Sequence, residues 1–400
     1  MPTTTKHRPP TGPLVGVRVI DLSVNVLGPV ATQILGDMGA DVIKIEAPQG
    51  DPNRDTGPAR HRGMSAMHMN MNRNKRSVTL DLKRPEALAA LMRLVETADV
   101  FVHSMRPAAA RRLGISYEAV SAVNPRIIYG FGPGYRQDGP QRDYPAFDDV
   151  VQGESGIASL MEQVNGEPRF YPTVIIDKLC GYVLASSIGM ALYARERTGQ
   201  GQMVQVPMFE TILSFNYLEH LWGGAFDPPL EPGVGYVRLL TKHRRPYRTK
   251  DGWICVLAVN DDQWRRILPA LGRPGLVDDP RYASTAARVA NYDELYGIVS
   301  TQLALRTTAE WHEILDRVDI PNGTLHSLQE LLQDPYLAET GFFQKYEHPT
   351  EGTVVTTAVP TQFSATPAGL HRPPPLLGEH TAEVLGELGL DAAAIGRVAG

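Results

Sequence analysis

One acidic residue stands where a carboxylate could act as a nucleophile. Asp177 lies at the predicted start of a long apolar helix over residues 177–198. Backbone N–H groups at a helix start would keep the carboxylate ionised and stabilise charge that develops near it. The position equally suits a helix N-cap, because Asp is among the preferred capping residues. The residue pattern alone leaves both roles open.

Two basic clusters beside predicted strands could bind phosphate groups. The first is residues 72–76, before a strand, and the second is Arg106 with Arg111 and Arg112, after another strand. Ligands of a parallel sheet bind beyond the carboxyl ends of its strands, so cations in these loops could hold an anion. The alternative is solvated surface, since loop Arg and Lys side chains usually face water.

Standard cofactor and nucleophile motifs are missing. The first predicted strand is followed by Gly28-Pro29 and not by G-x-G-x-x-G, and there is no G-x-x-x-x-G-K-[ST] or H-E-x-x-H. Residues 153–156, Gly-Glu-Ser-Gly, lack the G-x-S-x-G spacing of a nucleophile elbow. The sequence therefore does not support a dinucleotide-binding enzyme, a P-loop ATPase, a zinc protease or an α/β-hydrolase.

Composition excludes several further classes of protein. The 400 residues carry 39 basic and 44 acidic side chains, a net charge of −5 that is too mild and mixed for a dedicated nucleic-acid binder. No unbroken apolar run approaches the ~18 residues of a membrane span. Residues 1–13 lack the apolar core of a signal peptide. Cys180 and Cys255 are too few for a four-ligand zinc site, and we expect two buried thiols in a reducing, cytoplasmic protein.

The first half of the chain alternates strands and helices. Strands are predicted over residues 17–22, 41–46, 77–82, 100–103, 126–131 and 202–206, and helices over 29–38, 85–98, 177–198 and 207–221. This alternation predicts an α/β fold with a Rossmann-like, mostly parallel sheet covered by helices on both faces.

After this half the regular alternation of strands and helices ends. Residues 223–235 are rich in Gly and Pro, and residues 247–259 predict a hairpin with an Asp-Gly turn. Helices follow, one of them with a capping box from Thr307 to Glu310. We therefore expect a large α/β domain whose first segment is 1–222, a linker and smaller α+β domain over 223–330, and a return to the large domain over 331–400.

Several blocks of the sequence together resemble the family III CoA-transferases, the family of formyl-CoA transferase and carnitine CoA-transferase. The blocks are residues 14–46, 72–83, 106–114, 195–202 and 243–252, and they follow the family's order along nearly the whole chain. The resemblance implies a CoA-transferase that takes coenzyme A as a co-substrate, with no permanently bound cofactor and no metal. It also implies an interlocked homodimer, and acyl-CoA and carboxylic acid substrates in place of nucleic-acid or membrane partners.

The resemblance also assigns site residues. The family's nucleophilic aspartate matches Asp177, and its second acid matches Asp148. Contacts to CoA would come from Val26, Leu27, Asn72, Arg73, Asn74, Lys75, Ser104, Met105, Arg106 and Arg112. The implied mechanism passes through an aspartyl anhydride and an aspartyl-CoA thioester.

Departures from the family pattern leave alternatives open. Formyl-CoA transferase has Gln at the position of Val26, Arg at that of Ala47, and a run of glycines that this chain lacks, so the acids exchanged stay open. An α-methylacyl-CoA racemase is one alternative, although its His would fall on Phe147. A non-catalytic acyl-CoA-binding protein is the other, and Asp177 weighs against it.

Overall fold

The computed structural model describes residues 9–399, and the chain divides into two compact units. The larger unit consists of the residues up to 155, residues 172–213 and the residues from 335 onward. The smaller unit consists of residues 156–171 and 214–334.

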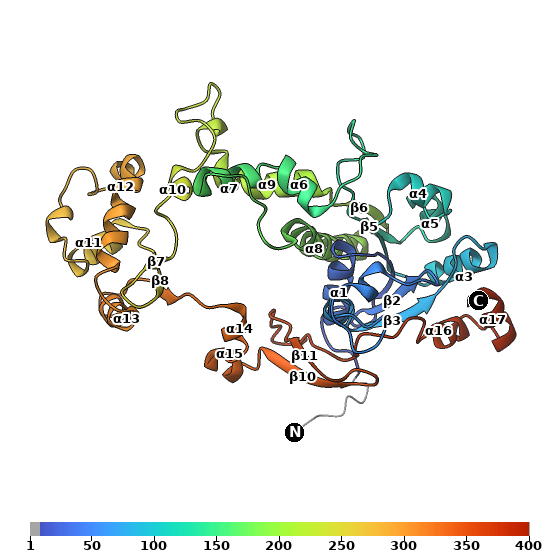
Figure 1. Cartoon of the computed structure of the whole chain (residues 1–400). Helices are drawn as coiled ribbons and strands as arrows, with labels where there is room; N and C mark the ends of the chain where they lie inside the picture. The colour runs from blue at the N-terminus through green and yellow to red at the C-terminus, as the bar shows by residue number, and fades with distance from the viewer. Residues whose placement is uncertain (1–8, 400) are drawn as a thin grey trace. The chain divides into compact units, whose positions relative to one another are not determined.

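A six-stranded parallel sheet forms the centre of the larger unit (Figure 1). Its strands lie in the order β3-β2-β1-β4-β5-β6, and every neighbouring pair is parallel. This is the strand order of the doubly wound Rossmann fold, so the expected mostly parallel α/β sheet is confirmed. The strands are β1 (Arg18–Leu22), β2 (Asp41–Glu46), β3 (Lys75–Thr79), β4 (Val100–His103), β5 (Ile128–Phe131) and β6 (Gln202–Gln205).

Helices cover both faces of this sheet because the strands β1 to β5 bury side chains on both sides. Ile20, Ile43 and Phe101 belong to an apolar core with α3 (Pro85–Glu96), α5 (Tyr117–Val123) and α16 (Thr381–Glu387). On the opposite face α1 (Leu27–Asp37) contacts β1 and β2, and α8 (Ile175–Thr198) contacts β5 and β6.

A glycine brings α1 and α8 into close contact, as their neighbouring positions in Figure 1 show. A Cβ atom on Gly181 would lie 2.8 Å from the carbonyl oxygen of Leu27 and 3.0 Å from the side chain of Val30. Only a residue without a side chain allows this approach. The start of α1 is thereby held against the first turns of α8.

Shorter elements complete the larger unit. They are η1 (Pro52–Asp55), α2 (Ala66–Met71), α4 (Pro107–Arg112), α6 (Asp148–Glu154), α15 (Pro335–Glu339), the antiparallel pair β10 (Phe343–His348) and β11 (Gly352–Thr357), and α17 (Ala392–Ala399). Helix α9 (Met208–His220) begins in the larger unit and ends in the smaller one.

The smaller unit combines a three-stranded antiparallel sheet with helices. Its strands are β7 (Tyr247–Arg248), β8 (Trp253–Val256) and β9 (Asn322–Thr324), and its helical elements are α7 (Ile157–Asn165), η2 (Trp222–Ala225), α10 (Val237–Leu240), α11 (Asp261–Ala270), η3 (Pro274–Leu276), α12 (Thr285–Leu303), α13 (Thr308–Arg317) and α14 (Leu328–Leu331). The pairing of β7 with β8 confirms the predicted hairpin, and the capping box from Thr307 to Glu310 is present. A separate core around Trp264, Tyr296 and Trp311 stabilises this unit.

Two sequence expectations are wrong in detail. Cys180 is buried, but Cys255 is exposed, because β8 turns every second side chain away from the core of the smaller unit. Among the described residues, α8 has the length and apolar composition of a membrane span, which a search for unbroken apolar runs missed. Its contacts with α1, β5 and β6 are those of a core helix.

Candidate active site

Asp177 lines a pocket at the carboxyl ends of the central strands. The loops that follow β1, β4 and β5 form this pocket together with the first turn of α8. Ligands of doubly wound sheets bind in this place because the loops diverge there. The pocket has a volume of about 200 Å³, and we call it the Asp177 pocket; its lining consists of residues 24–27, 104–107, 132–134, 142, 144, 146, 147, 177 and 208.

Five of the predicted CoA contacts lie in the Asp177 pocket. They are Val26, Leu27, Ser104, Met105 and Arg106. The backbone N–H of Val24 donates a hydrogen bond of 2.9 Å to the Ser104 hydroxyl, which fastens the loop after β1 to the loop after β4. Sequence positions 80 residues apart thus form one wall of the pocket.

Asp148, from the start of α6, caps α8. Its Oδ2 atom accepts hydrogen bonds from the backbone N–H groups of Ile176 at 2.8 Å and Asp177 at 3.1 Å. Its Oδ1 atom accepts a hydrogen bond of 2.6 Å from the Gln152 amide. The N-cap residue of α8 is Val174, which makes no capping bond through its side chain. The N-cap alternative for Asp177 is therefore wrong, because the carboxylate that accepts hydrogen bonds from the first N–H groups of the helix belongs to Asp148.

The environment of Asp177 disfavours its charged form. Burial raises the pKa of Asp177 to about 6, and repulsion from the neighbouring Asp148 adds to the increase. The expectation that helix N–H groups keep this carboxylate ionised is wrong, because Asp148 takes up two of those groups. At neutral pH the Asp177 carboxyl group is mostly ionised, yet more basic than an ordinary aspartate.

The first basic cluster, residues 72–76, lies inside the larger unit. The Lys75 ammonium contacts Asp21 at 3.2 Å and donates to the Thr32 hydroxyl at 2.7 Å, and burial lowers the pKa of Lys75 to about 8. The Arg73 guanidinium forms two bonds, of 2.9 and 2.7 Å, with Asp37. Asn72 and Asn74 are buried as well. The solvated-surface alternative is thus wrong for this cluster, whose side chains pair within the protein; their contact with CoA stays a prediction.

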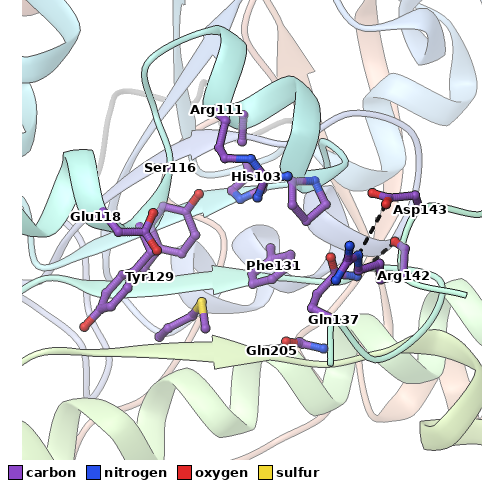
Figure 2. Close-up of a pocket in the computed structure, with 14 residues that line it drawn as sticks. His103, Arg111, Ser116, Glu118, Tyr129, Phe131, Gln137, Arg142, Asp143 and Gln205 are labelled. Atoms are coloured by element: carbon purple, nitrogen blue, oxygen red, sulfur yellow. Dashed lines mark hydrogen bonds and ion pairs between the residues drawn. The ribbon is translucent and has the colours of Figure 1, made fainter. Parts of the chain in front are cut away.

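The second basic cluster is divided between two surfaces. Arg106 lines the Asp177 pocket, whereas Arg112 lies exposed at the end of α4 and outside that pocket. Its contact with CoA also stays a prediction. Arg111 lines a different pocket of about 430 Å³, which Figure 2 shows between α4, α5 and the ends of β5 and β6.

The pocket in Figure 2 contains a histidine that sequence reasoning missed. His103 ends β4, its ring stacks on Phe131 at 5.2 Å, and burial lowers its pKa to about 4. The Nδ1 atom of His103 accepts a bond of 3.1 Å from the backbone of Met105, next to the Asp177 pocket. Its position at the end of a buried strand was the only sequence signal for this residue.

Two glycines of the Asp177 pocket also escaped sequence reasoning. A Cβ atom on Gly132 would lie 2.6 Å from the Leu27 side chain, and one on Gly134 would lie 2.3 Å from the Cβ atom of Ala146. The Gly-Pro-Gly sequence at 132–134, directly after β5, was the available signal. No group of three His, Cys, Asp or Glu side chains in the described part of the chain is placed to hold a metal ion.

Comparison with known proteins decides the family. The model of CoA-transferase family III matches residues 14–381. The chain belongs to this family. The resemblance noted in the sequence blocks is confirmed, and the chain is an enzyme of the CoA-transferase class.

Individual CoA-transferases of the family are similar over nearly their whole length. The succinate–glutarate CoA-transferase of Agrobacterium fabrum is 36% identical over 94% of this chain and 96% of its own length. The probable fatty acyl-CoA transferase Rv3272 of Mycobacterium tuberculosis is 33% identical over 96% of this chain and 99% of its own length. The crystal structure of an aspartate-to-alanine mutant of Rv3272 has a TM-score of 0.82, with 31% identity over 94% of this chain and 99% of that one.

Proposed function

We propose that this family III CoA-transferase moves CoA from an acyl-CoA donor to a free carboxylic acid, with Asp177 as the nucleophile. The observation that carries the proposal is the Asp177 carboxyl group, which is half-buried near Asp148 in the pocket at the carboxyl ends of β1, β4 and β5. Five positions that match family contacts to CoA line the same pocket.

The proposed reaction begins when the Asp177 carboxylate attacks the thioester carbonyl of the donor. The C–S bond breaks, CoA leaves as a thiolate, and an acyl-aspartyl anhydride remains. The thiolate then attacks the aspartyl carbonyl, which releases the donor acid and leaves an aspartyl-CoA thioester. Covalent attachment to Asp177 divides a difficult exchange into easier steps.

The second half of the reaction repeats these steps in reverse. The acceptor carboxylate attacks the aspartyl-CoA thioester, and the thiolate leaves again. It then attacks the acyl carbonyl of the new anhydride, which yields the product acyl-CoA and restores the Asp177 carboxylate. The sequence of steps balances without an electron donor or acceptor and without water.

Asp148 supports this role of Asp177 in two ways. Its hydrogen bonds to the backbone of Ile176 and Asp177 fix the first turn of α8. Its negative charge contributes to the raised pKa of Asp177, and a more basic carboxylate is the better nucleophile once ionised. Racemisation is not favoured, because Phe147, which lines the pocket next to Asp148, has no group that transfers protons.

The substitution Asp177→Asn tests the proposal. An amide cannot attack the thioester, so we expect loss of transferase activity with folding and CoA binding retained. In the wild-type enzyme, donor acyl-CoA without acceptor should leave CoA on the peptide that contains Asp177, where hydroxylamine traps it and borohydride reduces it. Near-normal exchange by Asp177→Asn, or an adduct on another peptide, would exclude Asp177 as the nucleophile.

We also propose that the enzyme is an interlocked homodimer located in the cytoplasm. Exposed apolar side chains on α8, including Met190 and Tyr193, support a partner chain on that face.

A further inference from the structure

A second cavity adjoins the Asp177 pocket. It has a volume of about 570 Å³ and lies between α1, α2, the first turns of α8 and the segment after β11. We call it the methionine pocket after Met38, Met67 and Met71, which line it with Val30 and Ile34. Its volume lies within the usual range of about 300–1000 Å³ for small-molecule sites.

The two pockets meet at the nucleophile. Val26 lines both of them. Val174, the N-cap residue of α8, and Lys178 in the first turns of that helix line the methionine pocket, while Asp177 between them lines the other. A thioester carbonyl held at Asp177 can therefore direct its CoA moiety toward Ser104 and Arg106 and its acyl chain into the methionine pocket.

The walls of the methionine pocket are mostly apolar, although polar side chains such as Gln33 and Asn70 also line it. Methionine side chains are flexible and polarisable, so they adapt to chains of different length. Of the two cations that line the pocket, Arg73 is bound to Asp37 by two hydrogen bonds, and the Lys178 ammonium donates to the Thr173 hydroxyl. Arg73 is thus neutralised by Asp37, and Lys178 is an exposed residue that keeps its ammonium in water, so an aliphatic chain would leave both cations as they are.

We propose that the methionine pocket binds the acyl chain of the substrate, and that this chain is aliphatic, several carbons long and without a distal carboxylate. The proposal rests on the proposed function, because it uses Asp177 as the point where the thioester lies. It predicts that the length of the acyl chain, which contacts Met67 and its neighbours, determines which acyl-CoA the enzyme binds.

Binding of S-alkyl-CoA thioethers tests this proposal separately from catalysis. These analogues cannot acylate Asp177, so their affinity by calorimetry is independent of whether Asp177 is the nucleophile. For the wild-type enzyme we expect about fourfold tighter binding per methylene from S-ethyl to S-hexyl, the factor that corresponds to about 0.8 kcal/mol per buried CH₂. Equal affinity of S-ethyl-CoA and S-hexyl-CoA would overturn the proposal.

Two substitutions at one position locate the chain. Met67→Trp should fill the pocket and abolish the dependence on chain length. Met67→Ala should extend the dependence to longer chains, and it serves the same purpose if the tryptophan variant does not fold. The matched control is Leu328→Trp, at a highly exposed position on α14, which should behave as the wild type. Unchanged length dependence in both Met67 variants would place the chain elsewhere.

A charged analogue tests the chemical class of the chain. S-(5-carboxypentyl)-CoA should bind at least tenfold more weakly than S-hexyl-CoA, because its carboxylate loses water among the methionine side chains, where Arg73 is already paired with Asp37. Equal or tighter binding of the carboxylated analogue would show a dicarboxylic acyl site and overturn the assignment. A wild-type enzyme that shows the length dependence but leaves no adduct on Asp177 would refute the nucleophile and retain the pocket.

Discussion

The carboxyl group of Asp177 titrates in a pH range in which activity is readily measured. Its pKa of about 6 results from burial first and from the charge of Asp148 second. If Asp177 attacks as a carboxylate, kcat/KM should fall as the pH drops below about 6, whereas an ordinary aspartate would give no decrease before about pH 4. A pH–rate profile between pH 4.5 and 8 measures this, and a flat profile down to pH 4.5 would contradict it.

The raised pKa of Asp177 also predicts how the stability of the fold depends on pH. The pKa of Asp177 lies above the 3.8 of an ordinary aspartate, so between these values the folded state holds a proton that the unfolded state releases. Stability from this group is therefore present below about pH 4 and lost as the pH rises through about 6. Asp177→Asn should be more stable than the wild type at pH 8, by about 1 kcal/mol after allowance for solvent screening, and equal to it near pH 4. Urea unfolding at both pH values checks this, and a less stable variant at pH 8 would contradict the origin of the shift.

Substitutions at Asp148 distinguish the effect of its charge from the effect of its hydrogen bonds at the start of α8. Asp148→Asn keeps an oxygen for the N–H groups of Ile176 and Asp177 but removes the negative charge. The acid limb of the pH–rate profile should therefore move to lower pH, with a stability change below about 1 kcal/mol, since Asn caps helices about as well as Asp. Asp148→Ala should instead lose about 1–3 kcal/mol by urea unfolding, because two N–H groups lose their acceptor. An unmoved acid limb in Asp148→Asn would show that Asp148 does not influence Asp177 through its charge.

At the scale of elements, β3 is joined to β1 and α1 by buried charges. The Lys75 ammonium on β3 contacts Asp21 on β1 at 3.2 Å, and both side chains are fully buried. Lys75→Met leaves Asp21 without this cation and should destabilise the fold by about 3–5 kcal/mol in urea unfolding. Lys83→Met, at an exposed position after the same strand, is the control and should change stability by less than about 0.5 kcal/mol.

The Lys75 variant also tests the role implied by the family resemblance. If Lys75 acts mainly through Asp21, the folded fraction of Lys75→Met should bind CoA with nearly wild-type affinity. Unchanged stability together with a large loss of CoA affinity would instead identify Lys75 as a ligand of CoA.

At the scale of the whole molecule, α8 exposes an apolar surface that a second chain can cover. Met190 and Tyr193 are 70% and 65% exposed although they lie on the longest helix of the larger unit. We expect sedimentation velocity at micromolar concentration to give about twice the 43.9 kDa mass of one chain. Met190→Lys should weaken this association, and a monomer of the wild type under these conditions would contradict the homodimer.

The local pattern of the sequence determined most of the fold. β-branched runs such as residues 41–46 and 100–103 predicted strands that the structure contains, and the alternation of strands with helices predicted their parallel arrangement. The position of Asp177 at the start of α8 and its part in the site were also visible, because a helix start and a family motif are local features of the chain. The resemblance brought in Asp148 for the same reason.

Only the tertiary structure decided what surrounds these residues. Whether residues 72–75 face water or the interior depends on Asp21 and Asp37, which β1 and α1 bring to them from distant parts of the sequence. The cap of α8 by Asp148 and the raised pKa of Asp177 depend likewise on a contact between α6 and α8. Charges, burial and cavities of this kind arise from residues far apart along the chain, so local spacing does not determine them, and three-dimensional packing does.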